Sequence, residues 1–238
     1  RKMKPKPEDS LEVLNLLKKE WSLLSFLTLE QTQYLQKNIS VLYFQKNQII
    51  YEEGDLPTQL MCLVRGKVHV FRRTCTGKHQ IVRMIKPIEM FAYRAFFAEE
   101  KYLTSALASS DAVVCTIPRQ VILDLVLQNN CLAMYFIKLL AVDLGQSDVR
   151  SVNLTQKHLR GRLAEALISL KDHYGYEKDT STLNIALTRK DLANFSNMTT
   201  ANAIRSLSQF SEEKIISIYK RKITILDEKM LLKISQMG

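Results

Sequence analysis

The sequence predicts an α+β protein: an N-terminal antiparallel β-barrel or jelly roll of cupin-like type, a long helix, and a C-terminal winged helix-turn-helix. Three observations predict this fold. Short apolar runs alternate with turn residues over residues 40–117. Apolar residues then recur at helical spacing over residues 132–154. Two short capped helices and a basic hairpin follow over residues 188–225.

The composition is that of an ordinary globular protein, with 46% hydrophobic and 24% charged residues in a chain of 238. No apolar run approaches the roughly 20 residues that a membrane span needs, and the polar start RKMKPKPEDS does not resemble a signal peptide. We therefore expect a cytoplasmic protein with no membrane partner. The net charge of +10 favours an anionic partner such as nucleic acid.

The cysteines predict neither a disulfide framework nor a metal site, because none lies within metal-ligand spacing of another. Cys62 and Cys115 stand in apolar runs and are predicted to be small core residues. Cys75, in the turn TCTGK, is the best candidate for a reactive thiol.

The chain divides into three predicted parts: residues 1–130 with the N-terminal helices and the barrel, residues 131–155 with the long helix, and residues 156–238 with the helix-turn-helix. Ser10 is a cap candidate for a first helix, and Thr28 is one for a second. Apolar residues at helical spacing predict a helical stretch over residues 10–39, which the second cap divides into two short helices. These apolar residues are Leu11, Leu14, Leu17, Leu24 and Leu27.

Glycines mark the turns of the predicted barrel. Gly66 interrupts the run QLMCLVRGKVHVFRR. Thr76-Gly77 lies between HVFRR and HQIVRMI, where glycine can take the positive φ of a hairpin turn. The last apolar run ends at Pro118, which suits the first turn of the next helix.

The long helix is predicted to pair with its copy in a homodimer. Its residues at alternating steps of three and four form a seam of about three heptads. The seam residues are Ile137, Leu140, Leu144, Ser147, Ser151 and Leu154. The alternative interpretation is a helix that packs only on its own barrel.

The last third of the chain predicts DNA binding. Thr188 and Thr199 cap two short helices around the turn SNM, and Ala203, Ile204, Leu207 and Phe210 are the expected inner face of the second. Arg can pair with guanine, and Asn or Gln with adenine, while a basic hairpin can meet phosphates. The predicted DNA-binding residues are Thr188, Arg189, Thr199, Thr200, Asn202, Arg205, Ser206, Gln209, Lys220, Arg221 and Lys222.

Several motifs resemble the Crp/Fnr family of bacterial transcription regulators along almost the whole chain. They are YEEGD, LVRGKVHVF, TGKHQIVRMI, TIPRQ, GRLAEALISL and LTRKDLANFSNMTTANAIRSL, and FAYRAFFAEEKYLTSA is similar to members from the Bacteroidetes. The resemblance implies a cyclic-nucleotide-binding-like barrel and a homodimer on a pseudo-palindromic operator in double-stranded DNA. RNA polymerase would be a further partner of an activator. Many members carry Arg-Glu where this chain has Thr200-Ala201, which implies an unusual operator.

The resemblance also implies where an effector would bind, and there the chain departs from members that bind cyclic AMP. Ala92 and Tyr93 replace a Gly and the Glu that accepts from the ribose, and Thr104-Ser105 replace the Arg-Ser pair that holds the phosphate. In an extended strand, Arg94 would point away from Tyr93. The expected pocket residues are Met90, Tyr93, Arg94, Thr104, Ser105, Ser147 and Asp148.

Because this loop lacks the charge that binds phosphate, we expect neither cyclic AMP nor cyclic GMP in the usual mode. Residues 1–61 contain no Cys, which argues against the family's N-terminal iron–sulfur cluster. Haem stays open as a ligand, although a lone His is more often a core or surface residue than a haem ligand. The candidate ligands are His69, His79, His158, His173, Met61, Met84 and Met90. An apolar or aromatic effector stays open as well, as does a barrel without any effector.

Two further classes of function compete with a DNA-binding regulator. The first is a ligand-binding barrel, sensing a cyclic nucleotide or haem, whose second domain binds protein. The basic residues Arg205, Arg221 and Lys222 favour DNA over protein. The second is an enzyme, and the sequence offers no nucleophile–base pair, HExxH, Walker loop or GxGxxG. We therefore predict a regulator without enzymatic activity.

Overall fold

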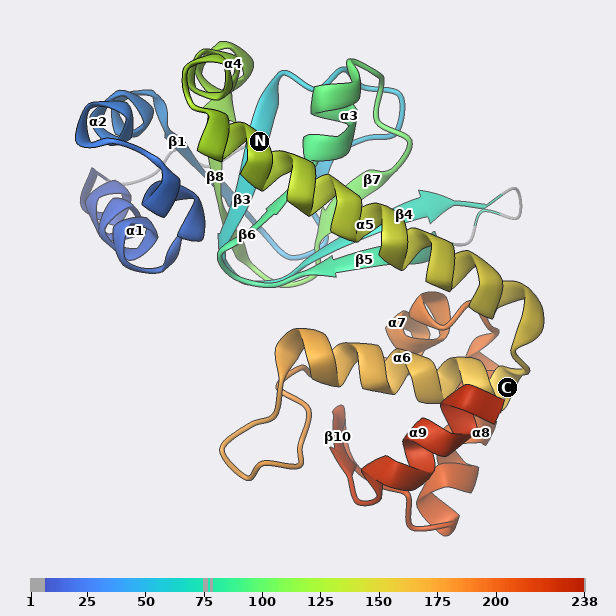
Figure 1. Cartoon of the computed structure of the whole chain (residues 1–238). Helices are drawn as coiled ribbons and strands as arrows, with labels where there is room; N and C mark the ends of the chain where they lie inside the picture. Colours follow the sequence, from blue (N-terminus) through green and yellow to red (C-terminus); the bar gives the residue numbers. More distant parts are fainter. Residues whose placement is uncertain (1–6, 75–76, 78, 238) are drawn as a thin grey trace. The chain divides into compact units, whose positions relative to one another are not determined.

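The computed structural model describes residues 7–74, 77 and 79–237 (Figure 1). The chain forms two compact units, each described here by itself. The first comprises Arg1–Arg73 and Val82–Leu144, and the second comprises Thr74–Ile81 and Gly145–Gly238. Cys75 and Thr76, for which the sequence predicts a reactive thiol and a turn, lie outside the described residues.

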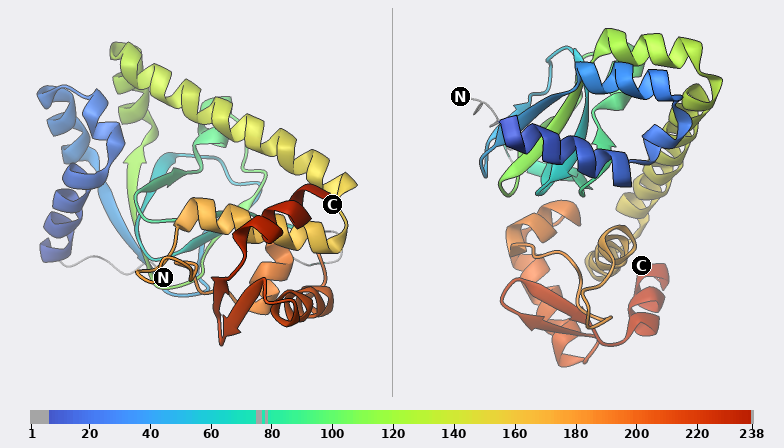
Figure 2. Two further views of the ribbon diagram at one scale, coloured as in Figure 1. Left: turned by 60° about the horizontal axis from the view of Figure 1, so that its bottom comes forward. Right: turned by 90° about the vertical axis from the view of Figure 1, so that its left-hand side faces the viewer.

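The N-terminal helices form as the sequence predicts, with a correction at the start. α1 (Pro7–Glu20) begins before Ser10, so Ser10 is not its cap, and proline is well suited to the first turn of a helix. The short 3-10 helix η1 (Ser22–Phe26) leads to α2 (Leu29–Asn38). Thr28 caps α2 in a reciprocal pair with Gln31, which confirms that prediction. Leu17 of α1 and Leu35 of α2 belong to one core cluster with Val41 of β1 (Ser40–Phe44) and Cys115 of β8 (Ala112–Pro118). The two helices lie beside these strands (Figure 2).

The predicted antiparallel β domain is confirmed as two four-stranded sheets. One has the strand order β1-β8-β3-β6 and the other β2-β7-β4-β5. Its core contains both Cys62 and Cys115, paired directly across β3 and β8. The strands are β1 (Ser40–Phe44), β2 (Ile49–Tyr51), β3 (Gln59–Arg65), β4 (Val68–Arg73), β5 (His79–Ile85), β6 (Glu89–Phe91), β7 (Ser105–Ala108) and β8 (Ala112–Pro118).

Gly66 shows why a turn glycine is needed between β3 and β4. Its φ is +93°, a left-handed conformation that side chains disfavour. A Cβ atom there would lie 2.3 Å from the backbone oxygen of Asp111. The prediction of a glycine turn is therefore confirmed at Gly66, and Gly77 also has a positive φ of +75°.

Two helices and the first part of a third complete the first unit, which ends at Leu144. α3 (Tyr93–Ala98) follows β6, and α4 (Arg119–Gln128) follows β8, with Pro118 as its N-cap residue instead of in its first turn. α5 (Asn130–Gln156) is the predicted long helix. Among the described residues, no single helix is long and apolar enough to span a membrane; α4 and α5 meet that test only together, and they are bent by 113°.

The second unit contains the predicted helix-turn-helix and wing. α6 (Leu159–Tyr174) buries Leu163, Leu167 and Leu170. α7 (Arg189–Phe195) and α8 (Thr200–Glu212) form the helix-turn-helix, and β9 (Ile216–Tyr219) and β10 (Lys222–Ile225) form an antiparallel hairpin after it. α9 (Glu228–Met237) packs against α6 (Figure 1).

Candidate nucleic-acid interface and barrel site

The two helices of the helix-turn-helix start where the sequence predicts. The hydroxyl of Thr188 accepts a hydrogen bond from the backbone N–H of Asp191 at 3.1 Å, and the Asp191 carboxylate accepts one from the backbone N–H of Thr188. The Thr199 hydroxyl accepts from the backbone N–H of Asn202 at 3.2 Å. Thr188 and Thr199, both predicted DNA contacts, therefore use their hydroxyls to start α7 and α8.

The exposed face of α8 differs from the prediction at two residues. Ser206 is buried and Ile204 is 47% exposed, which is the reverse of the expected arrangement. Residues three, four and seven positions after Ala203 share its side of a helix, and they are Ser206, Leu207 and Phe210. Ile204 lies about 100° around the helix from Ala203 and therefore faces outward. Thr200, Arg205 and Gln209 are exposed as predicted, and Asn202 is half-buried.

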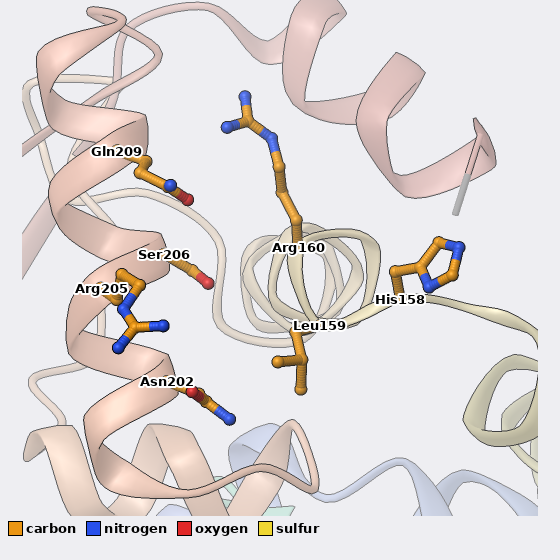
Figure 3. A pocket seen from close by; sticks show the side chains of 7 residues that line it. All are labelled: His158, Leu159, Arg160, Asn202, Arg205, Ser206 and Gln209. Carbon is orange, nitrogen blue, oxygen red and sulfur yellow. The ribbon is translucent and has the colours of Figure 1, made fainter.

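A hollow of about 330 Å³ lies between α8 and the start of α6 (Figure 3). Asn202, Arg205, Ser206 and Gln209 line it from α8. His158, Leu159 and Arg160 line it from the other side. Within the part of the chain that the structure describes, Arg205 has neither a hydrogen-bond nor an ion-pair partner, so its guanidinium is available to a ligand.

Contacts in the wing assign different roles to its predicted cations. Arg189 of α7 donates to the backbone oxygen of Lys220 at 3.3 Å and so joins α7 to the wing tip. Lys222 is the first residue of β10, not part of the tip, and its Nζ forms an ion pair with Glu177 at 2.8 Å. Arg221 is exposed at the tip. No local pattern marks Glu177 as a partner of Lys222, because 45 residues separate the two.

Curated relatives and a solved structure are similar to this chain over most of its length. It is 28% identical over 193 residues to the anaerobic regulatory protein of Bacillus subtilis (strain 168), covering 79% of this chain and 80% of that protein. It is 23% identical over 185 residues to the global nitrogen regulator of Nostoc sp., covering 76% and 83%. The structure of FixK2 from Bradyrhizobium japonicum has the same fold, with a TM-score of 0.75 at 18% identity over 82% of this chain and 96% of that one.

Two family models match successive parts of the chain. The cyclic nucleotide-binding domain matches residues 41–129, and the Crp-like helix-turn-helix domain matches residues 161–234. The chain belongs to the Crp/Fnr family. It is a Crp/Fnr-type DNA-binding transcription regulator, and this family is not enzymatic. The helix-turn-helix of this Crp/Fnr regulator, α7 and α8, is its DNA-binding part.

The barrel of this Crp/Fnr regulator holds a polar network at Tyr93. The Tyr93 hydroxyl donates to the Asp143 carboxylate of α5 and accepts from Arg83 of β5 at 3.0 Å. Arg83 also bonds Asp143 at 2.6 Å and Glu89 of β6 at 3.0 Å. Burial raises the pKa of Tyr93, and its hydrogen bond to Asp143 raises it further. Two carboxylates therefore face the one guanidinium of this network.

The predicted effector residues lie in different environments, and only Met90 and Tyr93 among them share a core cluster of the described residues. Tyr93 and Arg94 belong to the helix α3 instead of a strand, and Arg94 is exposed and paired with Glu100 at 3.1 Å. Met90 is buried, and the Ser105 hydroxyl accepts from the backbone N–H of Glu53 at 3.0 Å. Ser147 and Asp148 are exposed positions on α5, and the α5 residue that contacts Tyr93 is Asp143.

Ala92, just before this helix, occupies the position that the resemblance assigned to glycine. Its φ of +70° is left-handed, a conformation that costs a non-glycine residue roughly 1–2 kcal/mol. The backbone at Ala92 therefore has the conformation for which glycine is suited, although the side chains of this loop differ from those of the family members that bind cyclic AMP. No periodic pattern marks Arg83, Glu89 or Asp143 as members of the site.

The candidate haem ligands come from several elements, and Met61 of β3 and Met90 of β6 lie on paired strands. Among the described residues, no group of three or more His, Cys, Asp or Glu side chains is placed to hold a metal ion. His69 is buried, His79 and His158 are exposed, and Met84 and Met90 are buried in the barrel. Burial raises the pKa of the Cys115 thiol to about 12 and that of Cys62 well above its ordinary value.

Proposed function

We propose that this regulator is a homodimer that reads a pseudo-palindromic operator and responds to a signal other than cyclic AMP or cyclic GMP. The observation that carries the proposal is the exposed guanidinium of Arg205 on α8, at the edge of the hollow with Gln209. It has no hydrogen-bond or ion-pair partner among the residues that the structure describes. Arg can bond two acceptors of guanine at once in the major groove. Since DNA binding occurs at the chromosome, we also propose a cytoplasmic location.

The other exposed residues of α8 extend the proposed base contacts. Thr200 and Gln209 offer hydrogen-bonding groups, and Gln pairs well with adenine. Ile204 offers an apolar side chain that suits the methyl group of thymine. Because no Glu stands at Ala201, the contact to cytosine common in this family is missing, and we expect an operator of different sequence.

The proposed dimer forms through an exposed stripe on α5. Met134, Ile137 and Leu144 are 60%, 56% and 65% exposed, and with Ala141 they are spaced by three, four and three residues. Leu140, a predicted seam residue, instead packs partly against the barrel core. Ser147 and Ser151 are exposed further along α5, and the side chain of Leu154 lies outside the described residues. A large unpaired apolar stripe is typical of an interface.

The proposal of a different signal rests on Tyr93 and its partners. A cyclic nucleotide carries a negative phosphate, which needs a free donor cation. Arg83 is already bonded to Asp143 and Glu89, so an added phosphate would compete with two carboxylates. Arg94, the nearest cation in the sequence, is exposed and bonded to Glu100.

The proposed function is tested by selecting DNA from a random pool with the purified protein and mapping the selected sites by footprinting in its host. We expect one pseudo-palindromic sequence, with half-sites about one helical turn apart, and a dimer in sedimentation. Recovery of no preferred sequence would contradict the proposal and favour a second domain that binds protein. Transcription in vitro from a selected promoter then shows whether the bound protein engages RNA polymerase as an activator.

A further inference from the structure

A polar residue ends the barrel-facing side of α5. Leu132 and Phe136 are buried on this side, and Leu139 and Leu140 pack partly against the same core. Asp143 follows about three helical turns after Leu132, with 27% of its side chain exposed. A leucine would fit the pattern at this position, so the carboxylate requires an explanation.

One oxygen of Asp143 connects α5 to two other elements. It accepts from Arg83 of β5 at 2.6 Å and from the hydroxyl of Tyr93 at the start of α3. Arg83 continues the network to Glu89 of β6, whose other oxygen accepts from the backbone N–H of Lys86 at 3.1 Å. The Tyr93 ring is itself buried, with 1% exposure, so its hydroxyl is held in place.

These bonds constrain α5 in a way that its leucines cannot. Apolar contacts are non-directional, so a small roll of α5 that keeps Leu132 and Phe136 buried costs them little. A hydrogen bond requires its donor and acceptor at about 2.7–3.2 Å and well aligned. A small roll of α5 would still carry the Asp143 carboxylate out of this range, although Leu132 and Phe136 stay buried.

The same rotation determines where the outer side of α5 points. The exposed stripe through which the dimer is proposed to form lies on the side of α5 away from Leu132 and Phe136. In a two-fold dimer, any change in the roll of α5 appears twice, once in each subunit. The spacing between the two DNA-reading helices is a geometric consequence of how the subunits pair.

We propose that Asp143 is a positioning residue: through Arg83 and Tyr93 it fixes the rotation of α5 on the barrel, and thereby the half-site spacing that the dimer accepts. The inference rests on the proposed homodimer through α5. A polar group that specifies register within an otherwise apolar contact has its best-attested parallel in coiled coils.

The experiment compares the wild type with Asp143→Leu, Tyr93→Phe and the control Arg65→Gln. The Arg65–Glu12 ion pair is exposed and involves no residue of α5. Dissociation constants are measured for the selected operator and for two versions whose half-sites lie one base pair closer or further apart. We expect the wild type and the control to prefer their own spacing by roughly tenfold or more.

Asp143→Leu should prefer the half-site spacing of the selected operator by less than roughly threefold. The preference of Tyr93→Phe should lie between this value and that of the wild type, since Phe loses only one of the two bonds to Asp143. A purely structural role would lower the melting temperature of both variants and leave the spacing ratio of the folded dimers at the wild-type value, which would overturn the inference. If Asp143→Leu does not fold, the ratio for Tyr93→Phe decides. A wild type that is monomeric or indifferent to spacing would instead refute the proposed dimer itself.

Discussion

The guanidinium of Arg160 donates two hydrogen bonds to the carboxylate of Glu213, which joins the first turn of α6 to the C-cap of α8. Its Cζ lies 4.9 Å from the centre of the Phe210 ring. The hydrogen bond from Arg160 lowers the pKa of Glu213. Arg160 also lines the same hollow as Arg205, so Glu213 neutralises a cation close to the proposed DNA-binding face.

Glu213→Gln should therefore strengthen binding to all DNA sequences. The change frees the charge of Arg160, so we expect the salt dependence of the association constant to steepen by about one counterion. The free energy of unfolding should fall by less than about 1 kcal/mol, because both side chains are partly exposed. Fluorescence anisotropy with operator and scrambled DNA across a salt series measures the effect. Glu212→Gln is the matched control, and equal gains in both variants would show that only net charge matters.

Arg205 and Arg221 should contribute differently to DNA recognition. Arg205→Ala should cost roughly 1–3 kcal/mol per half-site on the operator and relax specificity at one base pair, because Arg can form two bonds to guanine.

Arg221→Ala should weaken operator and scrambled DNA by the same factor and lower the salt slope by about one for each phosphate that is no longer neutralised. Lys222→Ala should have the smaller effect of the two wing changes, since Lys222 is already paired with Glu177. Equal loss of operator and scrambled binding in Arg205→Ala would contradict its role as a base reader.

A charge in the α5 stripe should weaken the dimer. Leu144→Glu would bury an unpaired carboxylate in the proposed interface, and such burial is costly. Sedimentation at micromolar concentration should show a dimer for the wild type and dissociation for the variant. Leu127→Glu is the control, since Leu127 is 82% exposed on α4 and lies outside the stripe. A Leu144→Glu protein that stays as dimeric as the control would place the interface elsewhere.

Cyclic AMP should neither bind in the barrel nor alter the affinity for DNA. Arg83 is bonded to two carboxylates, and the family resemblance places Tyr93 where members that bind cyclic AMP have a Glu. Isothermal titration calorimetry with cyclic AMP and cyclic GMP should give no saturable heat. A site of micromolar or tighter affinity would show that a phosphate can displace the Asp143 carboxylate from Arg83.

The described cysteines should differ sharply in alkylation. With a pKa of about 12, the Cys115 thiol is only about one part in ten thousand thiolate at pH 8, and that fraction rises as the pH rises. Cys62 and Cys115 are fully buried, whereas Cys131 is exposed. Iodoacetamide at pH 8 should therefore label Cys131 in the native protein and label the other two only after unfolding. Mass spectrometry of the peptides measures this, and rapid native labelling of Cys115 would indicate that the β domain opens.

Much of the local structure could be predicted from the sequence. The caps Thr28, Thr188 and Thr199, the turn at Gly66 and the sequence of strands and helices depend on residues within a few positions of one another. Such short-range signals act through the backbone hydrogen bonds and φ angles of their own segment. The match of the whole pattern to the Crp/Fnr family follows from the same motifs.

Only the tertiary structure decided which sides of the helices are exposed and which distant charges meet. The apolar side chain of Ile204 and the polar one of Ser206 predict the reverse of their exposure in α8, and the heptad spacing did not show that Leu140 faces the barrel. The pairs Lys222–Glu177 and Arg83–Asp143 join residues 45 and 60 positions apart. The physical reason is that an ion pair depends on distance in space, which folding creates, whereas sequence periodicity describes only the order of residues along one element.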